Sequence, residues 1–396
     1  MIQTSEKNLC CGCETCGLVC PKNCIVFEKD VLGHKYAKVD EHFCVDCKKC
    51  ESVCPMQKHC GDTQIGCNAY VVYSKDADIR KRASSGVFFE TIATRMVDNG
   101  GYVFASKFDE NLKLKCFEAK NRDEVKALTK SKYLQSECSH VFPVIRQYLQ
   151  DGKNVLFVSS PCQVAALKAY LGKIGNSDNL YLLDFFCHGV PSQDFFDKCI
   201  HYVEQKKDIV VRNYEFRSKI KNGKTPHYYT LTYEKNHSLK KKTSLYISDP
   251  FYLGFQKYIT LRESCYNCPY GAGNHVADLT MGDFHNVDKY IGGINRFDGV
   301  SLVIQNSQKG LVLWNLIKDS FVTYDVDVDA LYRNKEIYAG GTHKPASRDD
   351  FLKDVKEMDM NALVDKWLNE KREWKKQIYY RLPDFIRNNL KRLMGL

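Results

Sequence analysis

Apolar residues between positions 68 and 172 follow two different spacings in turn. Short, mostly apolar runs predict strands at 68–74, 101–108 and 154–160. Longer stretches with apolar residues three and four positions apart predict helices at 84–101 and 162–172. The first helix would have Ser84 or Ser85 as its N-cap and two glycines at its end.

The alternation continues along the chain. Strands are predicted at 180–189, 276–284 and 300–307, and helices at 192–206 and 309–320. Strands that alternate with helices are typical of an α/β layer, so we expect a sheet that is partly parallel. Residues 212–235 differ, because two strand-like runs flank Asn222-Gly223, which predicts an antiparallel hairpin inserted into the α/β layer.

The composition is that of a globular protein, with 44% hydrophobic and 27% charged residues in 396 positions. This length suggests two or three domains. No run of about 18 apolar residues is present, and the start "MIQTSEKNLCCGC" lacks the pattern of a signal peptide. We therefore expect a cytoplasmic protein.

Cysteine is the residue with the most informative distribution. The chain has 19 cysteines, and twelve of them fall between Cys10 and Cys67. In a cytoplasmic protein thiols stay reduced, so this density indicates metal binding rather than disulfides.

Two runs with the spacing C-x-x-C-x-x-C-x-x-x-C-P account for eight of these cysteines, at 10–20 and 44–54. In ferredoxins with two 4Fe-4S clusters the fourth cysteine of each run binds the other cluster. One cluster is therefore assigned to Cys10, Cys13, Cys16 and Cys54. The second is assigned to Cys44, Cys47, Cys50 and Cys20. Zinc is the alternative, but zinc sites usually use two C-x-x-C pairs and not a triple spacing. Four cysteines are left over and would be packing or loop residues, namely Cys11, Cys24, Cys60 and Cys67.

A further C-x-x-C pair, Cys265 and Cys268, lies far from these runs. It could be half of a metal site, a redox disulfide or two packing residues. Cys162 and Cys187 each follow a predicted strand, where α/β proteins place their functional groups. With the pair, they would form a set of four thiolates.

Several motifs resemble those of the coenzyme F(420) hydrogenase/dehydrogenase beta subunit family, in a bacterial form with an N-terminal two-cluster 4Fe-4S ferredoxin domain. The resemblance extends from about residue 67 to 303. The motifs are "SSG" at 84–86, "SKYLQS" at 131–136, "SSPCQVAALKAYL" at 159–171, "DFFCHGVPS" at 184–192 and "CYNCPYGAGNHVADLTMGDF" at 265–284.

This resemblance implies a flavin, FAD or FMN, beside a third 4Fe-4S cluster. The cluster would be held by Cys162, Cys187, Cys265 and Cys268. The flavin and its phosphates would be lined by Ser84, Ser85, Gly86, Lys132, Tyr133, Gln135 and Ser136. In place of a second glycine that the family often has after the serines, this chain has Val87.

The implied activity is that of an iron–sulfur flavoprotein oxidoreductase. Electrons would pass from a ferredoxin-type donor or partner redox subunit through the clusters to the flavin and a small-molecule or lipid-linked substrate. Relatives of this architecture resemble proteins that accompany surface-polysaccharide synthesis. His188 is either a proton donor near the flavin or a residue that caps a strand end. The alternatives are a non-catalytic electron-transfer subunit and an enzyme that uses a deazaflavin coenzyme.

The expected fold combines α+β and α/β parts. A ferredoxin-like domain would occupy residues 1–64, a mixed α/β flavin and iron–sulfur body 65–345, and a helical basic tail 346–396. "SRDDF" at 347–351 resembles a capping box at the first helix of this tail. From residue 370 onward eight basic residues face three acidic ones, and the net charge of the chain is +10. The tail could lie on the inner face of a membrane or dock onto protein. No motif indicates nucleic-acid binding.

Overall fold

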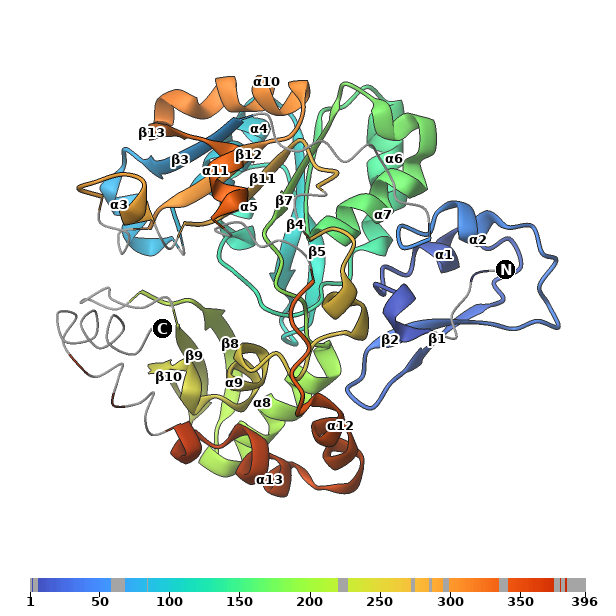
Figure 1. Ribbon diagram of the computed structural model, residues 1–396, viewed down its shortest axis with the longest axis vertical. Coiled ribbons are helices and arrows are strands. Elements are labelled where there is room, and N and C mark those ends of the chain that lie inside the picture. The colour runs from blue at the N-terminus through green and yellow to red at the C-terminus, as the bar shows by residue number, and fades with distance from the viewer. Residues whose placement is uncertain are drawn as a thin grey trace.

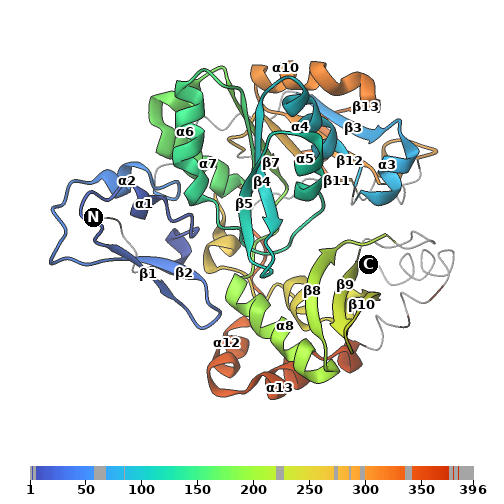
Figure 2. The same ribbon diagram turned by 180° about the vertical axis from the view of Figure 1, so that it is seen from behind.

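The computed structural model describes residues 2, 6–57, 68–83, 85–219, 227–271, 275–284, 287–294, 299–334, 341–373, 378 and 382. Figure 1 shows three parts, which we call the N-terminal module (residues 6–57), the body sheet with its helices, and a small lobe built on a second sheet. Figure 2 shows from behind that the module lies at the side of the body that carries α6 and α7, and that the small lobe lies below the body sheet.

The body sheet has eight strands in the order β13-β3-β12-β11-β7-β6-β4-β5. Strands β4, β6, β7 and β11 run parallel to one another, whereas the other four pair antiparallel with their neighbours. The predicted partly parallel sheet is thus confirmed. The strand bounds are β3 (Asn68–Ser74), β4 (Tyr102–Phe108), β5 (Leu114–Ala119), β6 (Val155–Val158), β7 (Leu180–Phe185), β11 (Leu279–Asp283), β12 (Ser301–Gln305) and β13 (Phe321–Val326).

Helices cover both faces of this sheet (Figure 2). One face packs against α4 (Phe88–Asp98), α5 (Arg122–Leu128) and α10 (Gln308–Ile317). The other packs against α6 (Phe142–Gln150) and α7 (Pro161–Leu171). Strand β6 is buried on both sides, which explains why its sequence is an unbroken apolar run. The shorter helices α3 (Ala77–Arg82) and α11 (Val328–Arg333) lie near the β3 and β13 edge.

The start of α4 corrects a prediction. Its N-cap position is Val87, in the left-handed conformation with φ 75°, and no side chain caps the helix. Ser85 lies before this position, and Ser84 lies outside the described residues. The predicted serine N-cap is therefore wrong, although the predicted helix and the positive-φ Gly100 behind it are present.

The small lobe contains the antiparallel strands β8 (Val210–Phe216), β9 (Tyr228–Lys235) and β10 (Ser238–Leu245). The predicted pairing of β8 with β9 is confirmed, and Asn222-Gly223 lies outside the described residues. Strand β10 was not predicted, because most of its side chains are polar and exposed. It is joined to β9 by Asn236 and His237, whose positive φ angles of 51° and 57° are typical of a tight hairpin turn.

Helices from two distant segments complete the core of the small lobe. They are α8 (Gln193–Lys207), α9 (Pro250–Gln256), α12 (Arg348–Glu357) and α13 (Met360–Leu363). Phe351 of α12 is fully buried and packs edge-on against Phe195 of α8. The described part of the C-terminal segment is therefore integrated into this lobe. Ser347 precedes α12 but makes no capping bond, so the predicted capping box is wrong.

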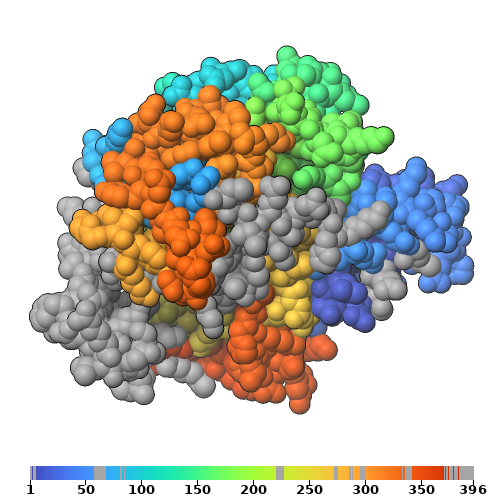
Figure 3. Space-filling model, turned by 45° about the horizontal axis from the view of Figure 1, so that its top comes forward, coloured from blue at the N-terminus to red at the C-terminus, as the bar shows by residue number. Residues whose placement is uncertain are grey.

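The N-terminal module repeats one local arrangement. A hairpin of β1 (Ile25–Lys29) and β2 (Lys35–Val39) accompanies two one-turn helices, α1 (Thr15–Leu18) and α2 (Lys49–Ser52). Each helix follows a residue in the left-handed conformation, Glu14 or Lys48. The two cysteine runs thus fold alike. Figure 3 shows the module against the part of the body that carries α6 and α7. In the described portion of the chain, no helix is long and apolar enough to span a membrane.

Candidate metal centres

The first predicted N-terminal set is brought together by the structure. Its members line one small cavity, together with Gly12 and Met56; they are Cys10, Cys13, Cys16 and Cys54. Burial raises the pKa of Cys16, and the charges of the three other thiols raise it further. Cys54 comes from the second run, so its position agrees with the predicted crossing of the fourth cysteine.

The second set also lines a single cavity, with Cys20 from the first run and Cys44, Cys47 and Cys50 from the second. A fifth thiol, Cys24, shares this cavity, and its Sγ lies 3.4 Å from the Sγ of Cys20. Hydrogen bonding with Cys20, followed by burial, raises the pKa of Cys24 to about 11. Cys24 was predicted to be a packing residue, and the structure places it within the sulfur environment of the set. Cys60 and Cys67 lie outside the described residues.

Four body cysteines converge from three segments. Cys162 opens α7, Cys187 follows β7, and Cys265 and Cys268 lie in and just after the short 3-10 helix Glu263–Asn267. Burial raises the pKa of Cys187, and the charges of Cys265, Cys162 and Cys268 raise it further. For the same reasons, burial first, the pKa of Cys265 is about 12 and that of Cys268 about 11. Cys162 and Cys268 pack against the same hydrophobic cluster, and a Cβ on Gly189, two residues after Cys187, would lie 3.0 Å from the Cys265 Cβ.

An all-thiol donor set suits an iron–sulfur cluster, which is held by cysteine thiolates. In a 4Fe-4S cubane each cysteine binds a different iron, so the four sulfurs surround the cluster and need not converge on one ion. Within the described ranges, no three His, Cys, Asp or Glu side chains converge on a single metal-ion position, and no disulfide joins the described cysteines. The body set thus has the same all-thiol donor chemistry as the two N-terminal sets.

The first N-terminal set and the body set are adjacent. Cys11 lies between them, since its thiol forms hydrogen bonds with Cys13 of the first set and Cys162 of the body set. These hydrogen bonds raise the pKa of Cys11. The hydroxyl of Tyr270, two residues after Cys268, donates a hydrogen bond to the carbonyl of Pro55, the residue after Cys54. Two independent contacts thus join the cysteine loops of the module and the body.

Two of the residues expected at a flavin lie beside β12. The Oγ of Ser85 is 3.0 Å from the Oγ of Ser301, which also accepts a hydrogen bond from the Gly86 amide at 3.0 Å. A Cβ on Gly86 would lie 2.5 Å from the Val72 carbonyl oxygen, so glycine is required here for close packing on the sheet. Lys219 lies nearby, since a Cβ on Gly299 would touch both the Ser85 carbonyl and the Lys219 Nζ.

The other expected flavin residues have partners within the protein. Lys132 donates to the carbonyls at the end of α5, and burial lowers its pKa to about 7. Tyr133 stacks on Phe255 with ring centroids 4.7 Å apart. Ser136 accepts a hydrogen bond from Ser106 at 2.7 Å.

Gln135 has a different place, at the contact between module and body. Its side-chain Nε2 donates to the carbonyls of Cys11 and Gly12, at 3.0 Å each, and its Oε1 accepts from Arg262 at 2.8 Å. The pattern "SKYLQS" gave no sign of this contact. Arg262 was also missed, and its signal in the sequence is a basic residue three positions before Cys265.

His188 follows Cys187, and burial lowers its pKa. Its carbonyl oxygen accepts a hydrogen bond from Thr342 at 2.6 Å. A second histidine near this strand end was not predicted. His275 lies 3.0 Å from a carboxylate oxygen of Asp184, whose other oxygen accepts a hydrogen bond from Thr280 at 2.6 Å. All three side chains are buried, so a polar network lies beneath the loop that carries Cys187.

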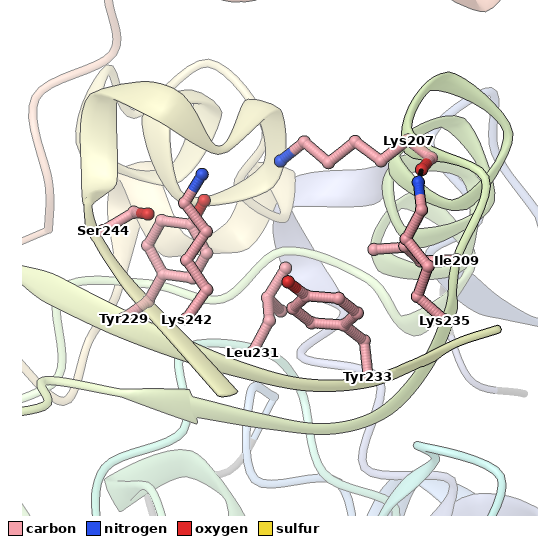
Figure 4. Close-up of a pocket in the computed structure, with 8 residues that line it drawn as sticks. All are labelled: Lys207, Ile209, Tyr229, Leu231, Tyr233, Lys235, Lys242 and Ser244. Atoms are coloured by element: carbon pink, nitrogen blue, oxygen red, sulfur yellow. Dashed lines mark hydrogen bonds between the residues drawn. The ribbon is translucent and has the colours of Figure 1, made fainter. Parts of the chain in front are cut away.

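The small lobe has a cavity of its own, of about 140 Å³. Figure 4 shows Tyr229, Leu231 and Tyr233 of β9 along its floor, with the side chains of Lys207 and Lys242 above them. None of the residues that line it belongs to the cysteine sets or to the residues expected at a flavin.

Comparisons with known proteins find a family match for part of the chain. Residues 152–327 match the family model that describes the C terminus of the coenzyme F(420) hydrogenase/dehydrogenase beta subunit. A solved structure, the xenon-derivatised F(420)-reducing nickel–iron hydrogenase complex from Methanosarcina barkeri, is similar at 15% identity and a TM-score of 0.44, over 79% of this chain and 92% of that one. No curated protein matches the chain. Residues 152–327, somewhat less than half of the chain, are thus similar to the C-terminal part of the coenzyme F(420) hydrogenase/dehydrogenase beta subunit family.

Proposed function

We propose that this chain is an iron–sulfur oxidoreductase subunit with three 4Fe-4S clusters. The observation that carries the proposal is the convergence of Cys162, Cys187, Cys265 and Cys268 next to Cys11 and Cys13 of the module. Sets of thiolates that adjoin in this way suit the transfer of single electrons between a protein donor and the body. The family match supports a redox role at the same coarse level.

We further propose that the body binds a flavin, FAD or FMN. A flavin exchanges hydride with organic substrates and single electrons with iron–sulfur centres. Among the described residues, the loop at the start of α4 fits the phosphate end, because free amides of a helix N-terminus and the nearby Lys219 favour an anion. Ser85 and Gly86 would lie at this end. The organic substrate and a link to surface-polysaccharide synthesis belong to the same proposal.

The second candidate is a subunit that only passes electrons to a partner enzyme. The family name favours it, since the matched family consists of beta subunits of hydrogenases and dehydrogenases. Use of a deazaflavin coenzyme is a variant of the first candidate. The two candidates differ in whether the body holds an organic redox cofactor.

Anaerobic purification followed by iron, sulfide and flavin analysis tests the proposal. Three cubanes require about twelve irons per chain, and the flavoprotein requires one flavin as well. About twelve irons without flavin would favour the electron-transfer subunit. About eight irons would contradict the assignment of a cluster to the body cysteines.

A further inference from the structure

Arg262 is one of the most deeply buried charged residues of the described chain, with 2% of its surface exposed. It lies in the loop between α9 and the 3-10 helix that carries Cys265, and its carbonyl accepts a hydrogen bond from the Cys265 amide at 3.0 Å. Its backbone amide donates to the Val190 carbonyl at 2.9 Å. The backbone of Arg262 is therefore part of the body's cysteine site.

The side chain of Arg262 points the other way, into the N-terminal module. Its Nη1 donates to the carbonyls of Lys35 at 3.0 Å and Cys10 at 3.4 Å. Its guanidinium carbon lies 4.8 Å from the centre of the Tyr36 ring. Gln135, which receives the Nε hydrogen bond, is itself bonded to the Cys11 and Gly12 carbonyls. Arg262 thus connects the first N-terminal set with the body set, and Cys11 lies between the same two sets.

The first cysteine loop is shaped to admit this guanidinium. Gly12 has a φ of +67°, and a Cβ at this position would lie 2.3 Å from the Arg262 Nη2. Any side chain at position 12 would have to displace the guanidinium, and the backbone conformation is itself unfavourable for residues other than glycine. The glycine between Cys11 and Cys13 therefore provides room for a residue of the body.

The charge of Arg262 needs a counter-charge, because a buried ion that is not paired is strongly destabilising. None of the ion pairs formed between described residues includes Arg262. Arg262 contacts the ring of Tyr36, the carbonyl of Cys10 and the amide of Cys265, so it lies between the first N-terminal set and the body set.

We propose that Arg262 is the counter-charge shared by the first N-terminal cluster and the body cluster, where it raises the reduction potential of both and holds the module on the body. The inference rests on the proposed function. A cluster gains negative charge on reduction, so a fixed cation in a dry site stabilises the reduced form. The second N-terminal cluster, held by Cys20, Cys44, Cys47 and Cys50, serves as an internal reference, because none of these residues contacts Arg262 among the described atoms.

Potentiometric titration of the anaerobic holoprotein, followed by electron paramagnetic resonance, tests the inference. In Arg262→Gln we expect two of the three clusters to shift to more negative potentials while the third stays unchanged. Arg262→Lys keeps the charge and should restore most of the shift. If Arg262→Gln fails to fold, Gln135→Leu removes the bond that fixes the guanidinium and should give a smaller shift in the same two clusters.

Arg348→Gln is the matched control. Arg348 is also buried, with 1% exposed, and donates to the carbonyls of Ile259 and Leu261 in the same loop, but it does not reach the module. Its loss should leave all three potentials in place. Full iron content with unshifted potentials in the Arg262 and Gln135 variants, or equal shifts in all three clusters, would overturn the inference alone. A wild-type content of about eight irons would overturn the proposed function as well.

Discussion

The hydroxyl of Tyr270 donates a hydrogen bond to the carbonyl of Pro55, across 215 positions of sequence. Tyr270 follows the body's C-x-x-C pair, and Pro55 is the proline that ends the second cysteine run. Tyr270 is 3% exposed, so its hydroxyl has little access to water and its bond fixes one loop relative to the other. The separation of two candidate clusters is therefore set partly by a single side chain.

Removal of this hydroxyl should loosen the module without disturbing the body. In Tyr270→Phe we expect the free energy of docking of the module on the body to weaken by about 1 kcal/mol. Amide exchange in residues 10–57 should then be roughly fivefold faster. The control is Tyr266→Phe, because the Tyr266 hydroxyl donates to the Tyr258 carbonyl within the body. Unchanged exchange in Tyr270→Phe would show that the contact does not stabilise docking.

Removal of one cysteine of the body set should prevent binding of the proposed body cluster and leave the two N-terminal clusters in place. In Cys187→Ala we expect a loss of about four irons per chain, with the signals of the two N-terminal clusters retained. Cys199→Ala provides the comparison, because Cys199 is a buried cysteine that packs in the core of the small lobe, away from the cysteine sets. Equal iron in both variants would exclude Cys187 as a ligand.

The fifth thiol of the second set should be able to replace a lost ligand. Because Cys24 lies 3.4 Å from Cys20, we expect Cys20→Ala to keep its cluster with an altered spectrum. Cys24→Ala should resemble the wild type, and the double variant should lose about four irons. Complete loss of the cluster in Cys20→Ala alone would show that Cys24 cannot reach the iron.

The pair of Asp184 and His275 predicts a pH dependence. Burial lowers the pKa of His275, but the charge and hydrogen bond of Asp184 outweigh it, so the pKa lies above its ordinary value of 6.5. A raised pKa stabilises the folded state below the unfolded value, and this contribution is lost as the pH rises through the folded value. We expect the free energy of unfolding to fall between pH 6.5 and the folded pKa.

Asp184→Asn should reverse the direction in which the free energy of unfolding changes with pH. Without the carboxylate, burial alone acts on His275 and its pKa falls below the ordinary value, so stability should rise as the pH increases toward neutrality. Urea unfolding under anaerobic conditions, from about pH 5 to 8, measures both slopes. Parallel curves for the two proteins would show that the pair is not ionised in the folded state.

The backbone at Val87 is strained for a β-branched residue, since its φ is 75°. Val87→Gly and Val87→Ala both remove the two γ-methyl groups of the buried side chain, so their difference reports mainly the backbone. Glycine usually destabilises relative to alanine, but in the left-handed conformation we expect Val87→Gly to be the more stable variant by about 1 kcal/mol. Thermal unfolding of the two variants shows which of them is more stable.

Periodicity predicted six of the eight strands of the body sheet, because strands such as Val155–Val158 are buried on both faces and read as apolar runs. It missed β5 and β13, the two edge strands, which are only partly buried. Strand β10 was missed as well, because its lysine-rich sequence is mostly exposed and its conformation depends on pairing with β9. Periodicity also placed the cap of α4 on a serine, whereas the chain turns at Val87. Local patterns thus failed where distant strands or strained backbone determine the conformation.

Spacing predicted which cysteines line a common cavity in the N-terminal module, because three members of each set come from one local run and the fourth comes from the other run. The body set needed the strand ends as well, since Cys162, Cys187 and Cys265 meet only in the folded sheet. Arg262 and Gln135 could not be predicted in their roles, because their partners are backbone carbonyls of the module. Because every residue has a backbone carbonyl, the sequence does not indicate which carbonyls accept these hydrogen bonds.

The three sets also differ in when they can be completed as the chain is made. Each N-terminal set is whole once residue 54 has emerged, so a scaffold that delivers iron could load it on a nascent chain. The body set has to wait for Cys268 and for β11, which holds the next segment against β7. We therefore expect the proposed clusters to be completed in two stages, and a shortage of iron during synthesis should yield chains that hold the outer clusters but lack the inner one.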